Sequence, residues 1–247
     1  MTETSATEPR KPRLSAEQLR PLWPLLAIAC ALLALWLAWA AFAQYRAGER
    51  EDTLQRARDQ STTAIAATVK RDIDTLASRL AQPRMQAALA SGDLVGAADA
   101  LGKDWAGVEQ VEVLPADLDA LYAGLPKSGY GKLAALEAAL AGGKPVTWLV
   151  DDGGPRLALT APAMSGTETI GVAYVRFPLA HVTAPIASAT LGDDSYLALR
   201  QGNHNVAERG DDTLRNGAEV LATPVPGTDW RVAEAIGAVT CASGKRT

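Results

Sequence analysis

The longest apolar run of the sequence extends from Pro21 to Ala43 and contains no charged residue in 23 positions. A helix of roughly 20 apolar residues crosses the hydrocarbon core of a bilayer, which is about 30 Å thick. Within lipid the backbone must satisfy its own hydrogen bonds, and a helix does so. The run therefore predicts a single transmembrane helix over 21–43. The polar tail over 1–20, which contains two prolines, is predicted to be disordered.

The apolar run has two interpretations, a retained anchor and a cleaved signal. Ala41-Phe42-Ala43 before Gln44 fits the small-x-small pattern of a cleavage site. The run is longer than the apolar core of a signal peptide, which has about 7–15 residues. Trp23 and Tyr45 lie at its two ends, as interfacial aromatic residues do in retained spans. We expect an anchor in the lipid bilayer, and a secreted binding protein with a cleaved signal is the alternative.

The charges beside the span do not decide its orientation. Four Lys or Arg residues lie within about 17 positions of each end, so the positive-inside rule gives a tie. A short N-terminal tail with a large C-terminal domain is the usual arrangement of exported bacterial sensors. We therefore expect a single-pass protein of the inner (plasma) membrane, with a cytoplasmic N-terminus and a periplasmic C-terminal domain.

The segment over 44–83 has the apolar pattern of one long helix that ends before Pro83. Its apolar residues recur in steps of three and four, which places them on one face; they are Ile65, Val69, Ile73, Leu76 and Leu80. The first part of the segment has only Leu54 in two turns. We expect that part to be a stalk that rises from the membrane and pairs with a second copy in a homodimer, and the rest to pack on the following domain.

Residues 84–236 alternate between helical and strand patterns. Two short helices are predicted within 85–103, a strand over 108–114 and two further helices before Gly142-Gly143. From Pro145 onward strands dominate, because paired apolar runs are separated by Asp-Gly, Gly-Gly or Gly-Asn turns. The predicted strand elements are a hairpin around 153–154, a strand over 170–177, a hairpin around 202–203 and two strands joined around 224–227.

This order of elements predicts an α+β fold, a mixed and mainly antiparallel sheet with helices packed on one face. The last segment, 237–247, has neither periodicity nor apolar content and is predicted to be a disordered tail. It has the character of a truncated or frameshifted end, so we expect the chain to be a fragment of a larger product.

Composition excludes several function classes. The net charge is −4, and residues 44–247 sum to −5 without a block of Lys or Arg, which argues against nucleic acid as a partner. The two cysteines lie in the span and near the C-terminus, so no disulfide is expected. HExxH, Walker, CxxC and GxSxG motifs are all absent, and only two histidines occur. We expect no catalytic, metal or cofactor site, and no enzyme activity.

A small-molecule site remains the candidate chemistry. Trp148, Tyr174 and Arg176 lie on neighbouring predicted strands, and a pocket needs aromatic walls with a few fixed polar groups. Arg176 suits a carboxylate or a phosphate. The alternative is that Trp148 and Tyr174 belong to the core and that Arg176 is a solvated edge residue.

The phrases SYLALRQG, NVAERGD and PGTDWRVAEA, which follow a span and a long helix, carry a resemblance to known proteins. The architecture resembles the Cache/PAS-like extracytoplasmic sensors of bacteria. Over roughly residues 20–236 the chain is similar to the N-terminal membrane region of large proteobacterial phosphomannomutase/phosphoglucomutase proteins. The phosphoserine and metal loops of the mutase itself are absent. The nearest fragments, 151–154 and 203–205, lie where hairpin turns are predicted.

Two functional interpretations follow besides the secreted one. The first is a membrane-anchored extracytoplasmic sensory or interaction domain, non-catalytic in this chain, with a small-molecule ligand as its candidate partner. The resemblance implies the second, a regulatory or localising N-terminal region of a phosphohexomutase in exopolysaccharide precursor synthesis.

Overall fold

The computed structural model describes residues 22–123, 125–151 and 154–237. The predicted tail over 1–20, all but the first residue of the predicted tail over 237–247, and the turn residues 152–153 lie outside these ranges. The chain divides into two compact units, Met1–Arg50 and Glu51–Thr247.

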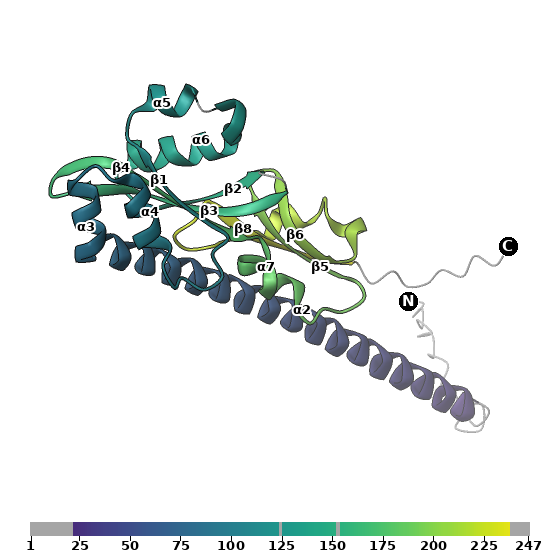
Figure 1. The fold of residues 1–247 in the computed structure, drawn as a ribbon. Coiled ribbons are helices and arrows are strands. Elements are labelled where there is room, and N and C mark those ends of the chain that lie inside the picture. The colour runs from purple at the N-terminus through teal and green to yellow at the C-terminus, as the bar shows by residue number, and fades with distance from the viewer. Residues whose placement is uncertain (1–21, 124, 152–153, 238–247) are drawn as a thin grey trace, which may run out of the picture. The chain divides into compact units, whose positions relative to one another are not determined.

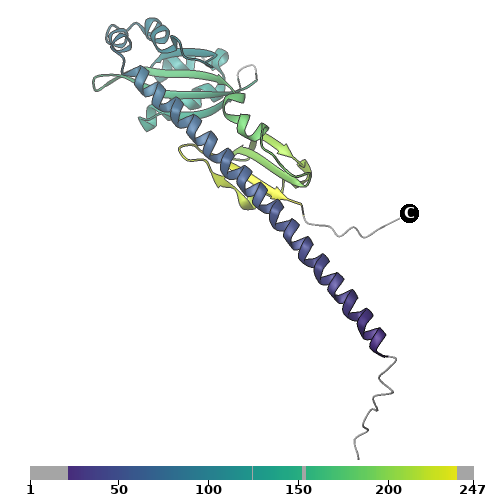
Figure 2. The same cartoon turned by 90° about the horizontal axis from the view of Figure 1, so that it is seen from below.

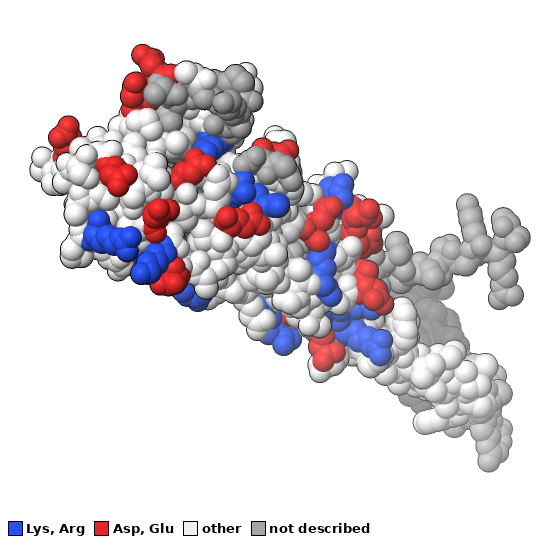
Figure 3. All heavy atoms as spheres, viewed as in Figure 1, with Lys and Arg blue, Asp and Glu red and all other residues white. Residues whose placement is uncertain are grey.

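The apolar run forms the start of helix α2 (Leu22–Leu80). In the first unit its large apolar side chains are exposed, among them Trp23, Trp36 and Trp39. The most apolar window of this helix has a mean hydropathy of 2.4, and none of it is buried. By length and composition the helix could cross a membrane. A signal sequence meets the same two criteria. Figure 3 shows neither acidic nor basic atoms along this apolar part on the face in view. As the sequence predicts, the helix continues without a break to a point just before Pro83.

The first sheet of the second unit has the strand order β1-β4-β3-β2, and all its neighbours are antiparallel. Its strands are β1 (Gln110–Pro115), β2 (Val146–Asp151), β3 (Pro155–Ser165) and β4 (Glu168–Pro178). Helices lie on both of its faces, α5 and α6 on one and α2, α3 and α4 on the other (Figure 1). These helices are α3 (Pro83–Ala90), α4 (Leu94–Gly102), α5 (Leu118–Ala123) and α6 (Leu125–Gly142).

The second sheet has the order β6-β5-β8-β7 and is also antiparallel. Its strands are β5 (Ser195–Gln201), β6 (His204–Gly210), β7 (Thr223–Pro224) and β8 (Trp230–Ile236). The short helix α7 (Ala180–Ala187) connects the two sheets, and the 3-10 turns η1 (Asp212–Leu214) and η2 (Ala218–Leu221) lie between β6 and β7. The predicted α+β class with a long first helix is confirmed.

From Glu51 onward α2 runs beneath both sheets, as the two ribbon views show (Figures 1 and 2). The apolar stripe predicted from the sequence faces them, because Ile65, Val69 and Leu76 are fully buried in the main core. That core also contains one face of each sheet and helix α7. Burial of these large apolar side chains stabilises the unit through the hydrophobic effect.

Three sequence predictions need correction. The polar part of the stalk was predicted to be free of the domain, but Leu54 and Ala57 are buried and belong to the second unit. The single sheet with helices on one face is wrong, because the strands form two sheets and the first has helices on both faces. Of the two strands predicted around 224–227, the first is only two residues long, because 218–221 forms a 3-10 turn instead.

An aromatic chain joins α2 to the region between the sheets. The ring of Phe177 on β4 meets Trp105 edge to face at 5.8 Å and stacks on His181 of α7 at 4.7 Å. His181 Nε2 in turn lies 2.8 Å from Asp72 Oδ2 on α2. Phe177 is fully buried. The ring of Phe177 thus contacts Trp105 and His181, and His181 continues the chain of contacts to Asp72 of α2.

An ion pair joins α2 to the last strand. Arg58 Nη1 lies 2.6 Å from Glu234 Oε1 on β8, and both side chains are largely buried, at 17% and 8% exposure. Burial raises the pKa of Glu234, whereas the charge and the hydrogen bond of Arg58 lower it. The pair connects the beginning and the end of the second unit.

Candidate ligand site

The three candidate residues of the sequence share one face of the first sheet. The strand register aligns Trp148 with Ala158 and Ala158 with Arg176, so these residues form one row across β2, β3 and β4. Tyr174 lies two residues along β4 from Arg176, in the row of Thr160. Because side chains alternate along a strand, residues two apart point to the same face. Pairing across three strands thus brings together residues that are up to 28 positions apart.

Helix α6 covers this face. Its Leu133, Leu136 and Ala139 pack against apolar residues of the sheet, among them Val172 and Tyr174. Tyr174 is fully buried, as the core interpretation of the sequence holds, and Trp148 is half-buried at the margin of the same cluster. The other interpretation of Arg176, a solvated edge residue, does not fit, because β4 lies between β1 and β3.

A lysine of α6 and a glutamate of β1 meet over the Tyr174 ring. Lys132 Nζ lies 4.6 Å from the ring centroid, a cation–π geometry. The same ammonium forms an ion pair with Glu112, and Gln110 donates a hydrogen bond to that carboxylate. An aromatic face and a carboxylate are the groups that proteins use to hold an amine. In this structure Lys132 itself occupies that position.

Two guanidinium groups share one carboxylate beside this arrangement. Glu109 Oε2 accepts a hydrogen bond from Arg156 Nε at 2.8 Å and lies 3.5 Å from Arg176 Nε. Together with the Lys132–Glu112 pair, these contacts involve three basic and two acidic side chains. A guanidinium group such as that of Arg176 suits an anionic ligand group.

Sequence reasoning missed Lys132, Glu112, Glu109 and Arg156. These residues lie on α6, before or on β1, and on β3, so only the strand pairing and the placement of α6 bring them together. The spacing of Glu109 and Glu112, three residues apart, breaks the strand alternation. This spacing indicates an irregular strand but does not indicate that either glutamate forms an ion pair.

Two other groups of residues have structural roles. His181 is half-buried in the aromatic chain, where it stacks on Phe177. Arg209-Gly210-Asp211 lies where strand β6 ends and η1 begins, and Asp211 caps η1. Gly210 has a φ of +99°, and a Cβ there would lie 2.0 Å from the Ser195 carbonyl oxygen, so the position requires glycine. Among the described residues, no three His, Cys, Asp or Glu side chains are grouped to hold a metal ion.

Comparison with solved structures identifies the architecture. The structure is similar to the ligand-binding domain of the Pseudomonas aeruginosa PAO1 amino acid chemoreceptor PctC in complex with GABA, with a TM-score of 0.56 and 18% identity over 76% of this chain and 99% of that chain. The fold is Cache-like.

Two further structures share the Cache-like fold. The ligand-binding domain of PctB from the same organism, in complex with L-Arg, has a TM-score of 0.54 and 14% identity over 79% of this chain and 98% of that chain. The ligand-binding domain of the Pseudomonas fluorescens chemoreceptor CtaA, in complex with L-isoleucine, has a TM-score of 0.53 and 12% identity over 78% of this chain and 95% of that chain.

No family model matches the chain, and no curated protein matches it in sequence. The solved structures confirm the Cache-like part of the resemblance noted in the sequence. The similarity to the membrane region of the mutase proteins stays a prediction.

Proposed function

We propose that this chain is a membrane-anchored sensor whose second unit binds a small carboxylate-bearing molecule on the α6 side of the first sheet. One observation carries the proposal: Arg176 and Trp148 lie in one row of that sheet, with Tyr174 beside them, in a fold shared with ligand-binding domains of chemoreceptors. A guanidinium binds a carboxylate through two parallel hydrogen bonds, and a tryptophan supplies an apolar wall. The proposed function is a non-catalytic one.

The ligand class follows from charge and from the named complexes. GABA, L-Arg and L-isoleucine each contain a carboxylate and an amine. In this chain Lys132 already lies between Glu112 and the Tyr174 ring. Arg176 therefore recognises the carboxylate of the ligand. An amine group of the ligand has to compete with Lys132 for the contacts with Glu112 and the Tyr174 ring.

Placement in the cell and self-association are part of the proposal. The apolar part of α2 anchors the chain in the inner membrane, with the second unit in the periplasm and the N-terminus in the cytoplasm. Two copies pair through α2. Because Leu54 and Ala57 are buried within the second unit, the side of α2 opposite these residues is the one that remains for pairing.

A thermal melt of the full chain in neutral-lipid nanodiscs, against amino acids and short carboxylic acids, tests the function. Ligand at 100 times its Kd stabilises the folded state by about 2.7 kcal/mol, which is roughly 5–10 °C for a unit of this size. Arg176→Met keeps most of the side-chain stem and removes the guanidinium, so we expect the shift to disappear.

Arg231→Met is the matched control, because Arg231 is an exposed residue of the second sheet. It should keep the full ligand-induced shift. The proposal is wrong if none of the carboxylates raises the melting temperature, or if Arg176→Met retains the shift of the unmodified chain.

A further inference from the structure

A second site of different chemistry lies on the opposite side of the molecule, between α2, α3 and the end of α4. The hollow there has a volume of about 910 Å³. Five basic and two acidic side chains line it: Lys70, Arg71, Arg79, Arg84, Lys103, Asp74 and Asp104. This surplus of three positive charges lies on a domain whose overall charge is negative.

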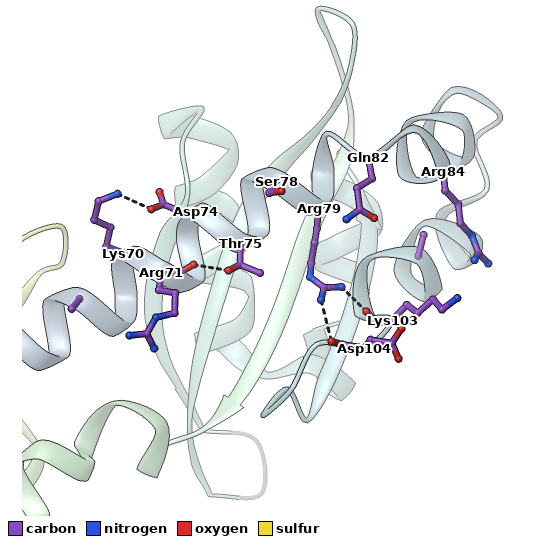
Figure 4. Close-up of a pocket in the computed structure, with 12 residues that line it drawn as sticks. Lys70, Arg71, Asp74, Thr75, Ser78, Arg79, Gln82, Arg84, Lys103 and Asp104 are labelled. Atoms are coloured by element: carbon purple, nitrogen blue, oxygen red, sulfur yellow. Dashed lines mark hydrogen bonds and ion pairs between the residues drawn. The ribbon is translucent and has the colours of Figure 1, made fainter.

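Two of the five basic side chains already have partners. Arg79 donates hydrogen bonds to the carbonyl oxygens of Leu101, Lys103 and Asp104 at 3.0, 2.6 and 3.2 Å, and its guanidinium lies over the Trp105 ring. Lys70 forms an ion pair with Asp74 at 2.6 Å. Arg79 therefore fixes the loop after α4 as a wall of the hollow (Figure 4).

The other three basic side chains carry the surplus charge. The side chains of Arg71, Arg84 and Lys103 form no hydrogen bond or ion pair with any other residue that the structure describes. Figure 4 shows Arg84 and Lys103 projecting on the same side of the hollow, from α3 and from the end of α4, and Arg71 on the α2 side. Arg84 and Lys103 also line a neighbouring hollow of about 550 Å³, to which Asp99 and Glu109 contribute. Glu109 is engaged by Arg156, so Asp99 is the remaining acidic side chain there.

Like charges on one concave surface repel one another, and a bound anion removes that repulsion. Guanidinium and ammonium groups bind carboxylate and phosphate oxygens through charge-assisted hydrogen bonds. We propose that this hollow binds a small anion with two or more negative charges, a polycarboxylate or a phosphate compound. The site is distinct from the α6 face, because the two lie on opposite faces of the first sheet.

Calorimetric titration of the full chain in phosphatidylcholine nanodiscs with citrate, inorganic pyrophosphate and acetate tests the proposal. Citrate or pyrophosphate should bind with 1:1 stoichiometry, acetate at least tenfold more weakly, and whichever of the first two binds better identifies the preferred anion chemistry. The R84Q/K103Q variant should weaken binding at least tenfold. Raising the salt from about 50 to about 300 mM should weaken it further, because both side chains are exposed.

The matched control is K144Q/R231Q, which removes two positive charges from exposed residues that do not line the hollow. It should change the affinity less than twofold, and Arg176→Met should leave it unchanged, which separates this site from the α6 face. The proposal is overturned if neither multivalent anion binds, or if R84Q/K103Q and K144Q/R231Q weaken binding equally. Unchanged melting temperatures of the variants without ligand verify that they fold.

Discussion

Replacing Phe177 with alanine is expected to lower the free energy of unfolding of the second unit by about 3–5 kcal/mol, as for other buried aromatic residues. The ring is fully buried and contacts both Trp105 and His181. Its removal leaves a cavity in the core and takes away the aromatic contacts with Trp105 and His181. For a unit of this size the melting temperature should fall by roughly 10 °C or more.

The chain provides its own control, because its only other phenylalanine is Phe42. Phe42 lies in the first unit and is 56% exposed. Phe42→Ala should leave the denaturant midpoint of the second unit unchanged, measured by near-ultraviolet circular dichroism of the full chain. Equal midpoints for the two variants would show that the Phe177 ring does not hold the core together.

Replacing Arg58 with alanine is expected to lower the free energy of unfolding by about 3 kcal/mol at pH 7. The change leaves the largely buried carboxylate of Glu234 without its cationic partner, and breaking a buried pair from one side is strongly destabilising. Lys70→Ala is the control, because the Lys70–Asp74 pair is 74% and 62% exposed. Exposed pairs contribute less than about 1 kcal/mol. Chemical denaturation measures the free energy of unfolding of both variants.

The cost of Arg58→Ala should depend on pH in a defined direction. Burial raises the pKa of Glu234, Asp59 and Glu51 raise it too, and Arg58 lowers it, so the variant raises this pKa further. A carboxyl group with a raised folded-state pKa binds protons more tightly in the folded chain than in the unfolded chain. Its folded state therefore loses stability as pH rises and regains it as pH falls. The difference in the free energy of unfolding between the variant and the unmodified chain should therefore shrink from pH 7 to about pH 5. A constant or growing difference would contradict this role of Glu234.

The sequence predicted the long helix and most local elements because their signals are local. The steps between Ile65 and Leu80 define a helix face within one segment, and that face is buried. Asp93 is of a residue type that caps helices, and its side chain accepts a hydrogen bond from the Gly96 N–H at 2.9 Å. The division into two sheets could not be read in this way, because strand pairing depends on contacts between distant segments.

The candidate site shows the same limit. Trp148, Tyr174 and Arg176 could be selected by residue type, and the register places them on one face. Lys132 was not predicted, since its partner Glu112 is 20 positions away on another element. The burial of Leu54 and Ala57 was not predicted, because two apolar residues in a polar segment give too weak a pattern.

Fluorine NMR of the full chain labelled with 5-fluorotryptophan tests the central claim most directly. Trp148 lies in the same row as Arg176 on the α6 side of the first sheet, with Ala158 between them, and Trp105 lies beside Arg79 on the other side. Each resonance is assigned by the corresponding Trp→Phe variant. A carboxylate that raises the melting temperature should shift the Trp148 resonance to saturation and leave the Trp105 resonance in place. An unmoved Trp148 resonance, with every such carboxylate at saturation, would contradict a ligand site on the α6 face.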